Sequence, residues 1–206
     1  MDTLIQSSAP SSNYLFAGSS LGGYSDSSGY SGYSGSGGGY SSRSTSSGSI
    51  ATSPASPTVV YTDGSALGNG RNGARGGVGV YFGENDSRNV SRSLDGDVQT
   101  NQRAELSAIR DALKITRNDD HVTVKTDSMY AKNSVTDWSK NWQDNGWKNA
   151  RGEPVANQDI IKDVLTEIGH RERSGKSTTF EHVAAHNGEP GNEAADRLAN
   201  QGAGRR

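Results

Sequence analysis

The sequence has no cysteine among its 206 residues. Disulfide bonds, thiolate zinc sites and cysteine nucleophiles are therefore excluded, and their absence fits a reducing compartment. No apolar run approaches the roughly 20 residues that a membrane-spanning helix needs, and the N-terminus lacks the basic region and apolar core of a secretory signal. We therefore expect an intracellular protein, nuclear or cytoplasmic, that does not bind membranes.

A strong net charge is also missing, since the formal net charge is −2. This value excludes a generally basic protein that coats nucleic acid through phosphate attraction alone. Any binding of nucleic acid must come from a local patch, or from metal ions held by carboxylates.

Residues 1–57 contain few aliphatic side chains, and their only charged residues are Asp2, Asp26 and Arg43. Ser, Gly and Tyr dominate this segment, which cannot bury enough apolar surface to offset its conformational entropy. We expect a disordered low-complexity tail that serves as a solvated linker, with self-association through its tyrosines as the alternative. Residues 58–206 have the length and composition of one globular domain.

Hydrophobic patterning within 58–206 predicts an α/β domain. A β-rich run at 59–62 ends at Asp63, and strands are predicted at 77–82 and 88–94 to complete an antiparallel meander. Further strands are predicted at 121–126 and 178–184. Helical spacing predicts helices at 103–116, with Thr100 as a plausible N-cap, and at 128–138, 157–172 and 192–201. Residues 139–151 are expected to form a loop or projecting segment.

Four acidic residues occupy unusual places in this pattern: Asp63 and Asp127 end predicted strands, Glu105 shares the apolar stripe of a helix, and Asp196 lies in a helix of small residues. Buried carboxylates are rare unless they are paired or bind a cation, and carboxylates that converge repel one another. All-oxygen ligation favours Mg²⁺ or Mn²⁺ over zinc. Taken singly, each residue has an ordinary alternative, namely a turn cap, a helix-dipole residue or a solvated helix face.

Motifs around these carboxylates resemble the type 1 ribonuclease H family, its eukaryotic members in particular. The segments that carry the resemblance occur in order at 61–65 (YTDGS), 100–105 (TNQRAE), 126–128 (TDS), 186–188 (HNG) and 191–196 (GNEAAD). Essentially all of 58–206 is covered. The resemblance implies a ribonuclease H-like fold, with a five-stranded mixed sheet of order 3-2-1-4-5 and helices on both faces.

The same resemblance implies an endonuclease that hydrolyses the RNA strand of RNA–DNA hybrids by a two-metal-ion mechanism. Asp63, Glu105, Asp127 and Asp196 match the metal-binding and catalytic quartet, with Mg²⁺ as the expected cofactor and Mn²⁺ as an alternative. The products would carry 5′-phosphate and 3′-hydroxyl ends. His186 matches a mobile loop histidine that assists proton movement or product release.

Substrate recognition can be assigned by the same matches. Asn69, Asn101 and Gln102 match positions that contact the RNA strand, where a 2′-hydroxyl both donates and accepts hydrogen bonds. Thr100 and Asn157 match a pocket for a DNA phosphate. A deoxyribose can pack closely on a flat aromatic ring. Tyr130 and Trp138 are expected to offer such rings to the DNA strand, with Trp142 and Trp147 nearby. For Trp142, packing in the core is the alternative.

Two departures from the family pattern weaken the expected grip on phosphate: Val98 replaces a basic residue, and Gln143-Asp144 stand where a lysine pair is common. Residues 1–57 also show no signature of a separate N-terminal hybrid-binding domain. We expect a monomer without a protein partner. The alternatives are a non-catalytic hybrid-binding module, or a self-associating low-complexity scaffold with a nuclease passenger domain.

Overall fold

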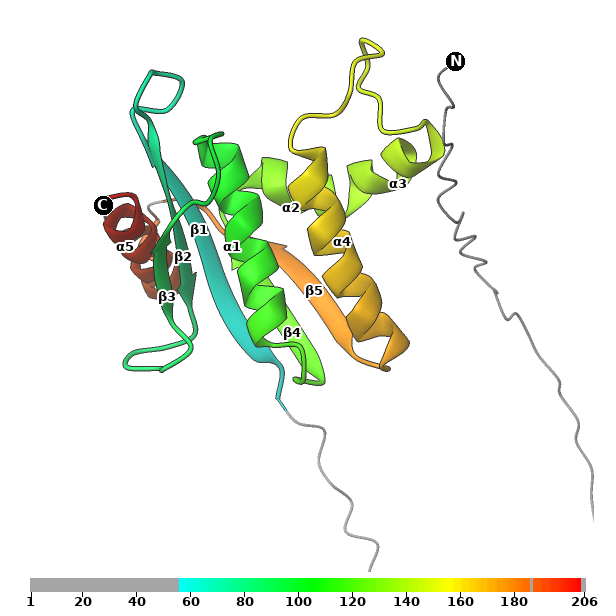
Figure 1. The fold of residues 1–206 in the computed structure, drawn as a ribbon. Coiled ribbons are helices and arrows are strands. Elements are labelled where there is room, and N and C mark those ends of the chain that lie inside the picture. The colour runs from blue at the N-terminus through cyan, green and yellow to red at the C-terminus, as the bar shows by residue number, and fades with distance from the viewer. Residues whose placement is uncertain (1–55, 186, 205–206) are drawn as a thin grey trace, which may run out of the picture. The chain divides into compact units, whose positions relative to one another are not determined.

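The computed structural model describes residues 56–185 and 187–204 (Figure 1). Five strands form one sheet of order β3-β2-β1-β4-β5. They are β1 (Thr58–Leu67), β2 (Arg75–Tyr81), β3 (Val90–Ser93), β4 (His121–Thr126) and β5 (Ser177–His182). The first three strands pair antiparallel, whereas β4 lies parallel to both β1 and β5. The predicted mixed sheet and its strand order are confirmed.

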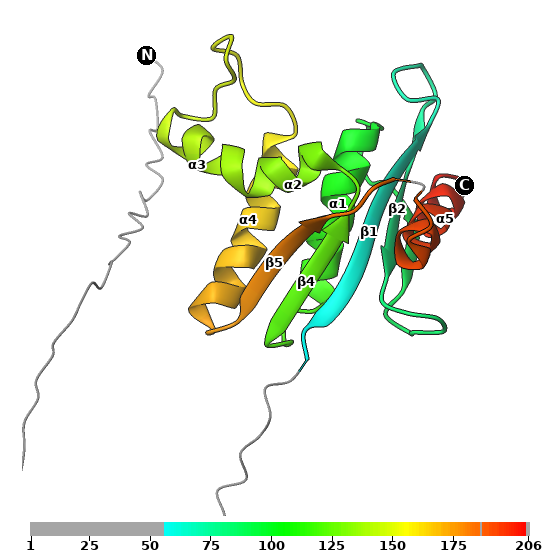
Figure 2. The ribbon, with the colours of Figure 1, turned by 180° about the vertical axis from the view of Figure 1, so that it is seen from behind.

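Five helices accompany the sheet within the described residues: α1 (Asn101–Ile115), α2 (Met129–Val135), α3 (Asp137–Asp144), α4 (Gln158–Arg173) and α5 (Pro190–Gly204). Figure 1 shows α1 and α4 in front of the sheet, and the reverse view in Figure 2 shows α5 on the opposite face. The prediction of helices on both faces is therefore confirmed. None of the helices in the described ranges is long and apolar enough to cross a bilayer.

The main core lies between the sheet and the face covered by α1 and α4. It is built from branched aliphatic side chains, among them the fully buried Val60, Val78, Val80, Leu106, Ile109, Leu113, Val124, Ile161 and Val164. Burying such side chains stabilises each by about 1.5–3 kcal/mol relative to exposure. This core fixes α1 against β1, and so sets where residues on the two elements meet.

On the other face, α5 packs its backbone directly onto β2. A Cβ atom added at Gly79 would lie 2.1 Å from the Ala195 carbonyl oxygen, and one at Gly77 would lie 2.0 Å from that of Ala199. Only glycine permits such an approach of helix to strand. The helix is therefore held by contacts that leave its backbone little freedom.

The strand that carries Asp63 is longer than predicted. β1 continues through Asp63 to Leu67, because its antiparallel pairing with β2 extends to the pair Leu67–Arg75. The parallel pairing with β4 stops earlier, at Thr62 and Thr126. Asp63 thus does not end β1. It is the first residue of β1 after the parallel pairing with β4 has ended.

The single helix predicted at 128–138 was wrong, since the segment forms two helices with a break at Thr136. The Thr136 backbone (φ −114°, ψ −84°) is not helical, and its hydroxyl donates to the Lys132 carbonyl at 2.9 Å. α2 therefore ends at Val135, and α3 begins after Thr136. α3 then runs to Asp144, inside the segment expected to be a loop. The rings of Trp138 and Trp142, one turn apart on α3, lie 5.8 Å apart. The other predicted elements are present, with ends displaced by a few residues.

Candidate active site

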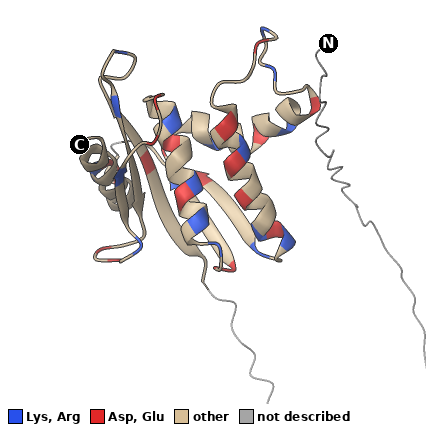
Figure 3. Ribbon diagram, viewed as in Figure 1, with Lys and Arg blue, Asp and Glu red and all other residues tan. Residues whose placement is uncertain are grey.

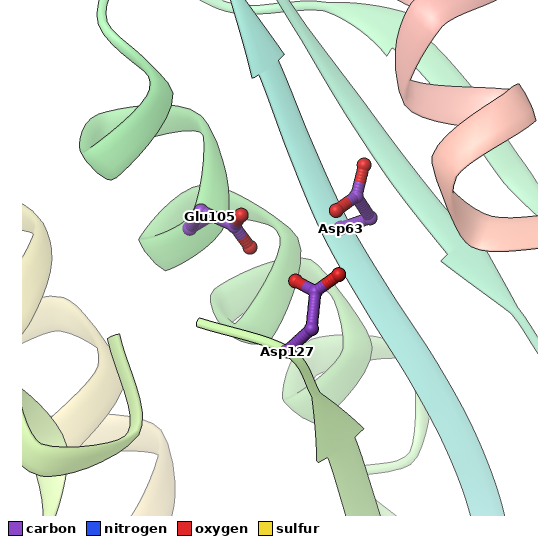
Figure 4. Close-up of side chains that lie close together, drawn as sticks. All are labelled: Asp63, Glu105 and Asp127. Atoms are coloured by element: carbon purple, nitrogen blue, oxygen red, sulfur yellow. The ribbon is translucent and has the colours of Figure 1, made fainter. Parts of the chain in front are cut away.

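Three carboxylates converge at one edge of the sheet. Asp63 of β1, Glu105 of α1 and Asp127, which directly follows β4, each offer an oxygen within 4.8 Å of the others. In Figure 4 the three side chains point toward a common space between the strands and α1. The structure therefore brings together three of the four acidic residues singled out in the sequence.

Each carboxylate reaches this space for a local reason. β1 and β4 are adjacent parallel strands, so Asp63 and Asp127 follow the last paired residues at the same edge. Glu105 lies on the buried side of α1, whose N-cap is Thr100 as predicted. Gly64 lets α1 approach, because a Cβ atom there would lie 2.1 Å from the Glu105 amide nitrogen. The spacing of the cluster is therefore set by the end of the β1–β4 pairing, by the buried face of α1 and by the close approach that Gly64 permits.

The cluster is electrostatically costly without a cation. Asp63 is only 6% exposed, and its pKa is raised to about 7, first by burial and then by the negative charges of Asp127 and Asp196. Glu105 is 9% exposed, and burial followed by the charges of Asp63 and Asp127 raises its pKa well above the usual range. None of the ion pairs within the described residues involves these carboxylates.

A divalent cation fits the residues that are present. The buried Glu105 Oε2 has no hydrogen-bond partner within the described residues, which is costly for an ionised oxygen unless a cation binds it. All three donors are carboxylates, the ligand type that hard cations prefer. The cluster can therefore hold a metal ion, as the sequence predicted.

Asp196 lies near this cluster but is not part of it. It is half-buried on α5 and lines the same open cleft of about 350 Å³ as the three clustered carboxylates. Its charge contributes to the raised pKa of both Asp63 and Glu105. The structure thus places the fourth predicted ligand at the border of the site.

His186 lies outside the described residues, so its predicted role stays a prediction. Its neighbour Ala185 lines the cleft. Glu189, which directly precedes α5, accepts a hydrogen bond from the Tyr61 hydroxyl. Burial and this bond to Glu189 raise the pKa of Tyr61 to about 12.

The residues predicted to contact RNA lie beside the cleft. The Asn69 Oδ1 accepts from the Asn101 backbone N–H at 3.3 Å, which ties the β1–β2 turn to the start of α1. Asn101 also lines the cleft with Glu105. Gln102 is exposed in the first turn of α1. Their contacts with RNA remain a prediction.

The residues predicted to grip a DNA phosphate occupy the N-cap positions of two helices, and an ion pair joins the starts of these helices. Thr100 Oγ1 accepts from the Arg103 N–H at 3.3 Å at the start of α1, and Asn157 occupies the N-cap of α4. Arg103 donates to both oxygens of Asp159, at 2.9 and 2.5 Å, and so joins the two helix starts. Figure 3 shows acidic and basic residues alternating over α1 and α4.

The predicted aromatic surface is a continuous row of four rings. Neighbouring ring centroids lie 6.1 Å apart for Tyr130 and Trp138, 5.8 Å for Trp138 and Trp142, and 6.3 Å for Trp142 and Trp147. Asn157 donates to the Tyr130 hydroxyl at 3.2 Å, which joins the row to the start of α4. Trp138 is 39% exposed, whereas Trp142 and Trp147 are partly buried against the core.

One residue at the site was missed in the sequence. Asn192, 3% exposed, donates from Nδ2 to Asp127 Oδ2 at 3.0 Å and so fixes one orientation of that carboxylate. Its own Oδ1 is buried without a hydrogen-bond partner in the described chain. The motif at 191–196 contained Asn192, but nothing in the local pattern indicated a contact with a residue so far away in sequence.

The sheet topology and the carboxylate cluster together define an α/β domain with a candidate metal site where the parallel pairing of β1 and β4 ends. Residues 55–204 match the family model described as RNase H, and the chain belongs to the RNase H family. The predicted resemblance to type 1 ribonucleases H is confirmed by similarity to curated proteins named Ribonuclease H and Ribonuclease H1.

Two of these relatives are eukaryotic. Ribonuclease H of Schizosaccharomyces pombe is 43% identical over 145 residues, covering 70% of this chain and 52% of the relative. Ribonuclease H1 of Homo sapiens is 42% identical over 149 residues, covering 70% and 49%. The chain thus spans about half the length of these curated relatives.

A solved structure shares the fold. The foamy viral protease-reverse transcriptase in complex with an RNA/DNA hybrid is 27% identical, with a TM-score of 0.59 over 70% of this chain and 20% of that one.

Proposed function

We propose that this chain is an endonuclease that hydrolyses the RNA strand of RNA–DNA hybrids, leaving 5′-phosphate and 3′-hydroxyl ends. The observation that carries the proposal is the cluster of Asp63, Glu105 and Asp127, with its unpartnered buried oxygen, among the residues that line an open cleft. The names of the curated relatives, and the hybrid bound to the viral relative, support this activity and substrate.

The cofactor that suits the site is Mg²⁺, with Mn²⁺ as the alternative, because the donors are carboxylates without histidine or thiolate. Bound there, divalent ions would supply an activated water and neutralise charge on the phosphate in an in-line displacement. The carboxylate oxygens of Asp63, Glu105 and Asp127 would hold the ions. Asn192 keeps the Asp127 carboxylate in one orientation through its 3.0 Å bond.

Strand discrimination would come from polar residues beside the cleft and from the aromatic row that contains Trp138. Asn69 and Asn101 present polar groups beside the cluster, where hydrogen bonds to 2′-hydroxyls would select RNA. Trp138, which is exposed and does not line the cleft itself, would offer the DNA strand a flat surface on which a deoxyribose packs closely. A 2′-hydroxyl on that strand would be crowded and desolvated against the ring.

Phosphate attraction on the DNA side is expected to be modest. Arg103 lies close to Thr100, but its guanidinium is already paired with Asp159. Val98, at the position where the family pattern has a basic residue, is 54% exposed and contributes no charge. Binding there would therefore depend on hydrogen bonds and aromatic contacts, with a shallow dependence on salt concentration.

The test is cleavage of end-labelled RNA–DNA hybrid, duplex RNA and duplex DNA of one sequence, with Mg²⁺ and with excess EDTA. We expect the RNA strand of the hybrid alone to be cut, and only with the metal. Hybrid binding without cleavage would identify a non-catalytic module. Comparable cutting of all three duplexes would exclude hybrid specificity.

A further inference from the structure

The Asp196 carboxylate at the border of the site is held by the neutral side chain of Asn200. Asn200 donates from Nδ2 to Asp196 Oδ1 at 3.0 Å, and its Oδ1 accepts from the Ser65 hydroxyl at 2.6 Å. An ionised carboxylate can only accept hydrogen bonds, so the amide nitrogen must face Asp196 and the amide oxygen must face Ser65. The two bonds together fix the orientation of the amide.

The chain of bonds joins α5 to the strand that carries the metal cluster. Asp196 and Asn200 lie one turn apart on α5, and so face the same way. Ser65 lies on β1, two residues after Asp63, and lines the same cleft as Asp196. Asn200 therefore connects the border of the site with the strand at its centre.

The backbone around Asp196 is already fixed by the packing of α5 on β2, where a Cβ atom at Gly79 would lie 2.1 Å from the Ala195 carbonyl oxygen. The backbone packing does not fix the side chain of Asp196, whose orientation depends on its own contacts, and Asn200 supplies one of them. Asp196 is half-buried, belongs to no ion pair in the described ranges, and lies outside the three-carboxylate cluster. An unrestrained carboxylate loses rotamer freedom when it binds a cation, which weakens that binding.

We propose that Asn200 is a positioning residue for Asp196, and that it engages Oδ1 so that Oδ2 is the oxygen offered to a divalent cation in the cleft. Ser65 anchors the amide that does this. Because asparagine is uncharged, it orients the carboxylate without adding a positive charge that would repel the cation. The proposal rests on the proposed function in taking the cleft as a metal-binding site.

Asn200→Leu keeps much of the side-chain volume and removes the donor, at an exposed position where folding should tolerate the change. Metal affinity is measured without substrate, by calorimetric titration of the metal-free full chain with Mn²⁺ and by the Mn²⁺-dependent rise in melting temperature. We expect about tenfold weaker binding, the low end for a residue that orients a metal ligand. Ser65→Ala, which leaves the amide unanchored, should show a smaller loss in the same direction.

The matched control is Gln201→Ala, because Gln201 is the next residue on α5 and its side chain makes no hydrogen bond to another described residue. It should leave Mn²⁺ affinity unchanged. In an Asp196→Asn background, Asn200→Leu should cause no further loss, because the ligand that it orients has been removed. A structural role for Asn200 would instead give the same loss in both backgrounds.

Cleavage gives a second readout. The Mg²⁺ concentration for half-maximal hybrid cleavage should rise about tenfold in Asn200→Leu, while KM for the hybrid stays unchanged. Unchanged Mn²⁺ affinity in Asn200→Leu, or an equal loss in the Asp196→Asn background, would overturn the proposal. A wild-type chain that binds Mn²⁺ but cuts no hybrid would refute the proposed function and leave the binding comparison valid.

Discussion

Gly64 and Glu105 lie so close that no other residue fits at position 64: an added Cβ atom would lie 2.1 Å from the Glu105 amide nitrogen and 2.4 Å from the Ala104 carbonyl carbon. The neighbouring atoms are backbone, which cannot swing aside as a flexible side chain would. This contact sets the distance between β1 and α1, and hence the spacing of the carboxylates of Asp63 and Glu105.

Gly64→Ala should therefore separate strand and helix, lower the free energy of unfolding by about 3 kcal/mol or more, and abolish metal-dependent cleavage. Gly83→Ala is the matched control, because a Cβ atom at Gly83 meets nothing within 4 Å. Thermal unfolding and single-turnover cleavage of both variants check this. A Gly64→Ala protein with wild-type activity would show that the spacing is not set by this contact.

The metal-free protein should become less stable as pH rises through neutrality. The folded pKa of Asp63 is raised to about 7, mainly by burial, above an unfolded value of about 3.9. A raised pKa means that this group favours folding below about pH 4 and loses that contribution as pH rises through about 7. Melting temperatures in EDTA should therefore fall between pH 5 and pH 8.

Asp63→Asn is the control for this pH dependence, because the amide does not titrate and keeps the shape of the side chain. It should reduce the slope of melting temperature against pH, and saturating Mg²⁺ should reduce it in the wild type by favouring the ionised carboxylates. A wild-type profile that is flat or rises between pH 5 and pH 8 would contradict the electrostatic account of the cluster.

Trp138 and Trp142 should respond differently to truncation. Trp138 is exposed at the end of α3 nearest Tyr130, so Trp138→Ala should weaken hybrid binding about five- to tenfold, near the low end for an aromatic contact with nucleic acid. Trp142 packs partly against the core, so Trp142→Ala should chiefly lower the melting temperature. Unchanged hybrid affinity in a folded Trp138→Ala protein would remove this residue from the binding surface.

His186 carries a prediction that depends on the sequence motif alone. His186→Ala should slow turnover about 10²-fold, the low end for loss of a general acid–base group, and leave hybrid affinity unchanged. His170→Ala is the control, because His170 is an exposed residue of α4 that bonds Arg173 rather than the cleft. A collapse of hybrid affinity in His186→Ala would make it a binding residue.

The sequence predicted the parts of the site that follow from local pattern and motif. Asp63, Glu105 and Asp127 stand out because acidic residues interrupt apolar periods, and the family resemblance supplied the strand order that brings them together. The partners of these carboxylates were not predictable in this way. Asn192 reaches Asp127, and Ser65 reaches Asn200, across packing between α5 and the sheet that no local period encodes.

The fold was predicted less well between residues 128 and 144, where one helix was expected and two are present. At Thr136 the backbone leaves the helical region and the helix breaks, although the hydrophobic spacing alone predicts that it continues. Beyond the break, Trp138 and Trp142 pack together and extend α3 into a segment rich in residues typical of loops. Trp142 also packs against the core, a tertiary contact that the local pattern does not reveal.

The central claim is that the carboxylate cluster performs metal-dependent cleavage, and Asp127→Asn tests it most directly because the change removes one charge and keeps the side chain's shape. The control is Asp97→Asn, an exposed acidic residue with no ion pair among the described residues. The measurement is the single-turnover rate of RNA-strand cleavage in a labelled hybrid with saturating Mg²⁺, alongside melting temperature in EDTA. We predict that Asp127→Asn lowers the rate by several orders of magnitude at an unchanged or slightly higher melting temperature, while Asp97→Asn matches the wild type. An Asp127→Asn protein that retains most of the wild-type rate would contradict the account.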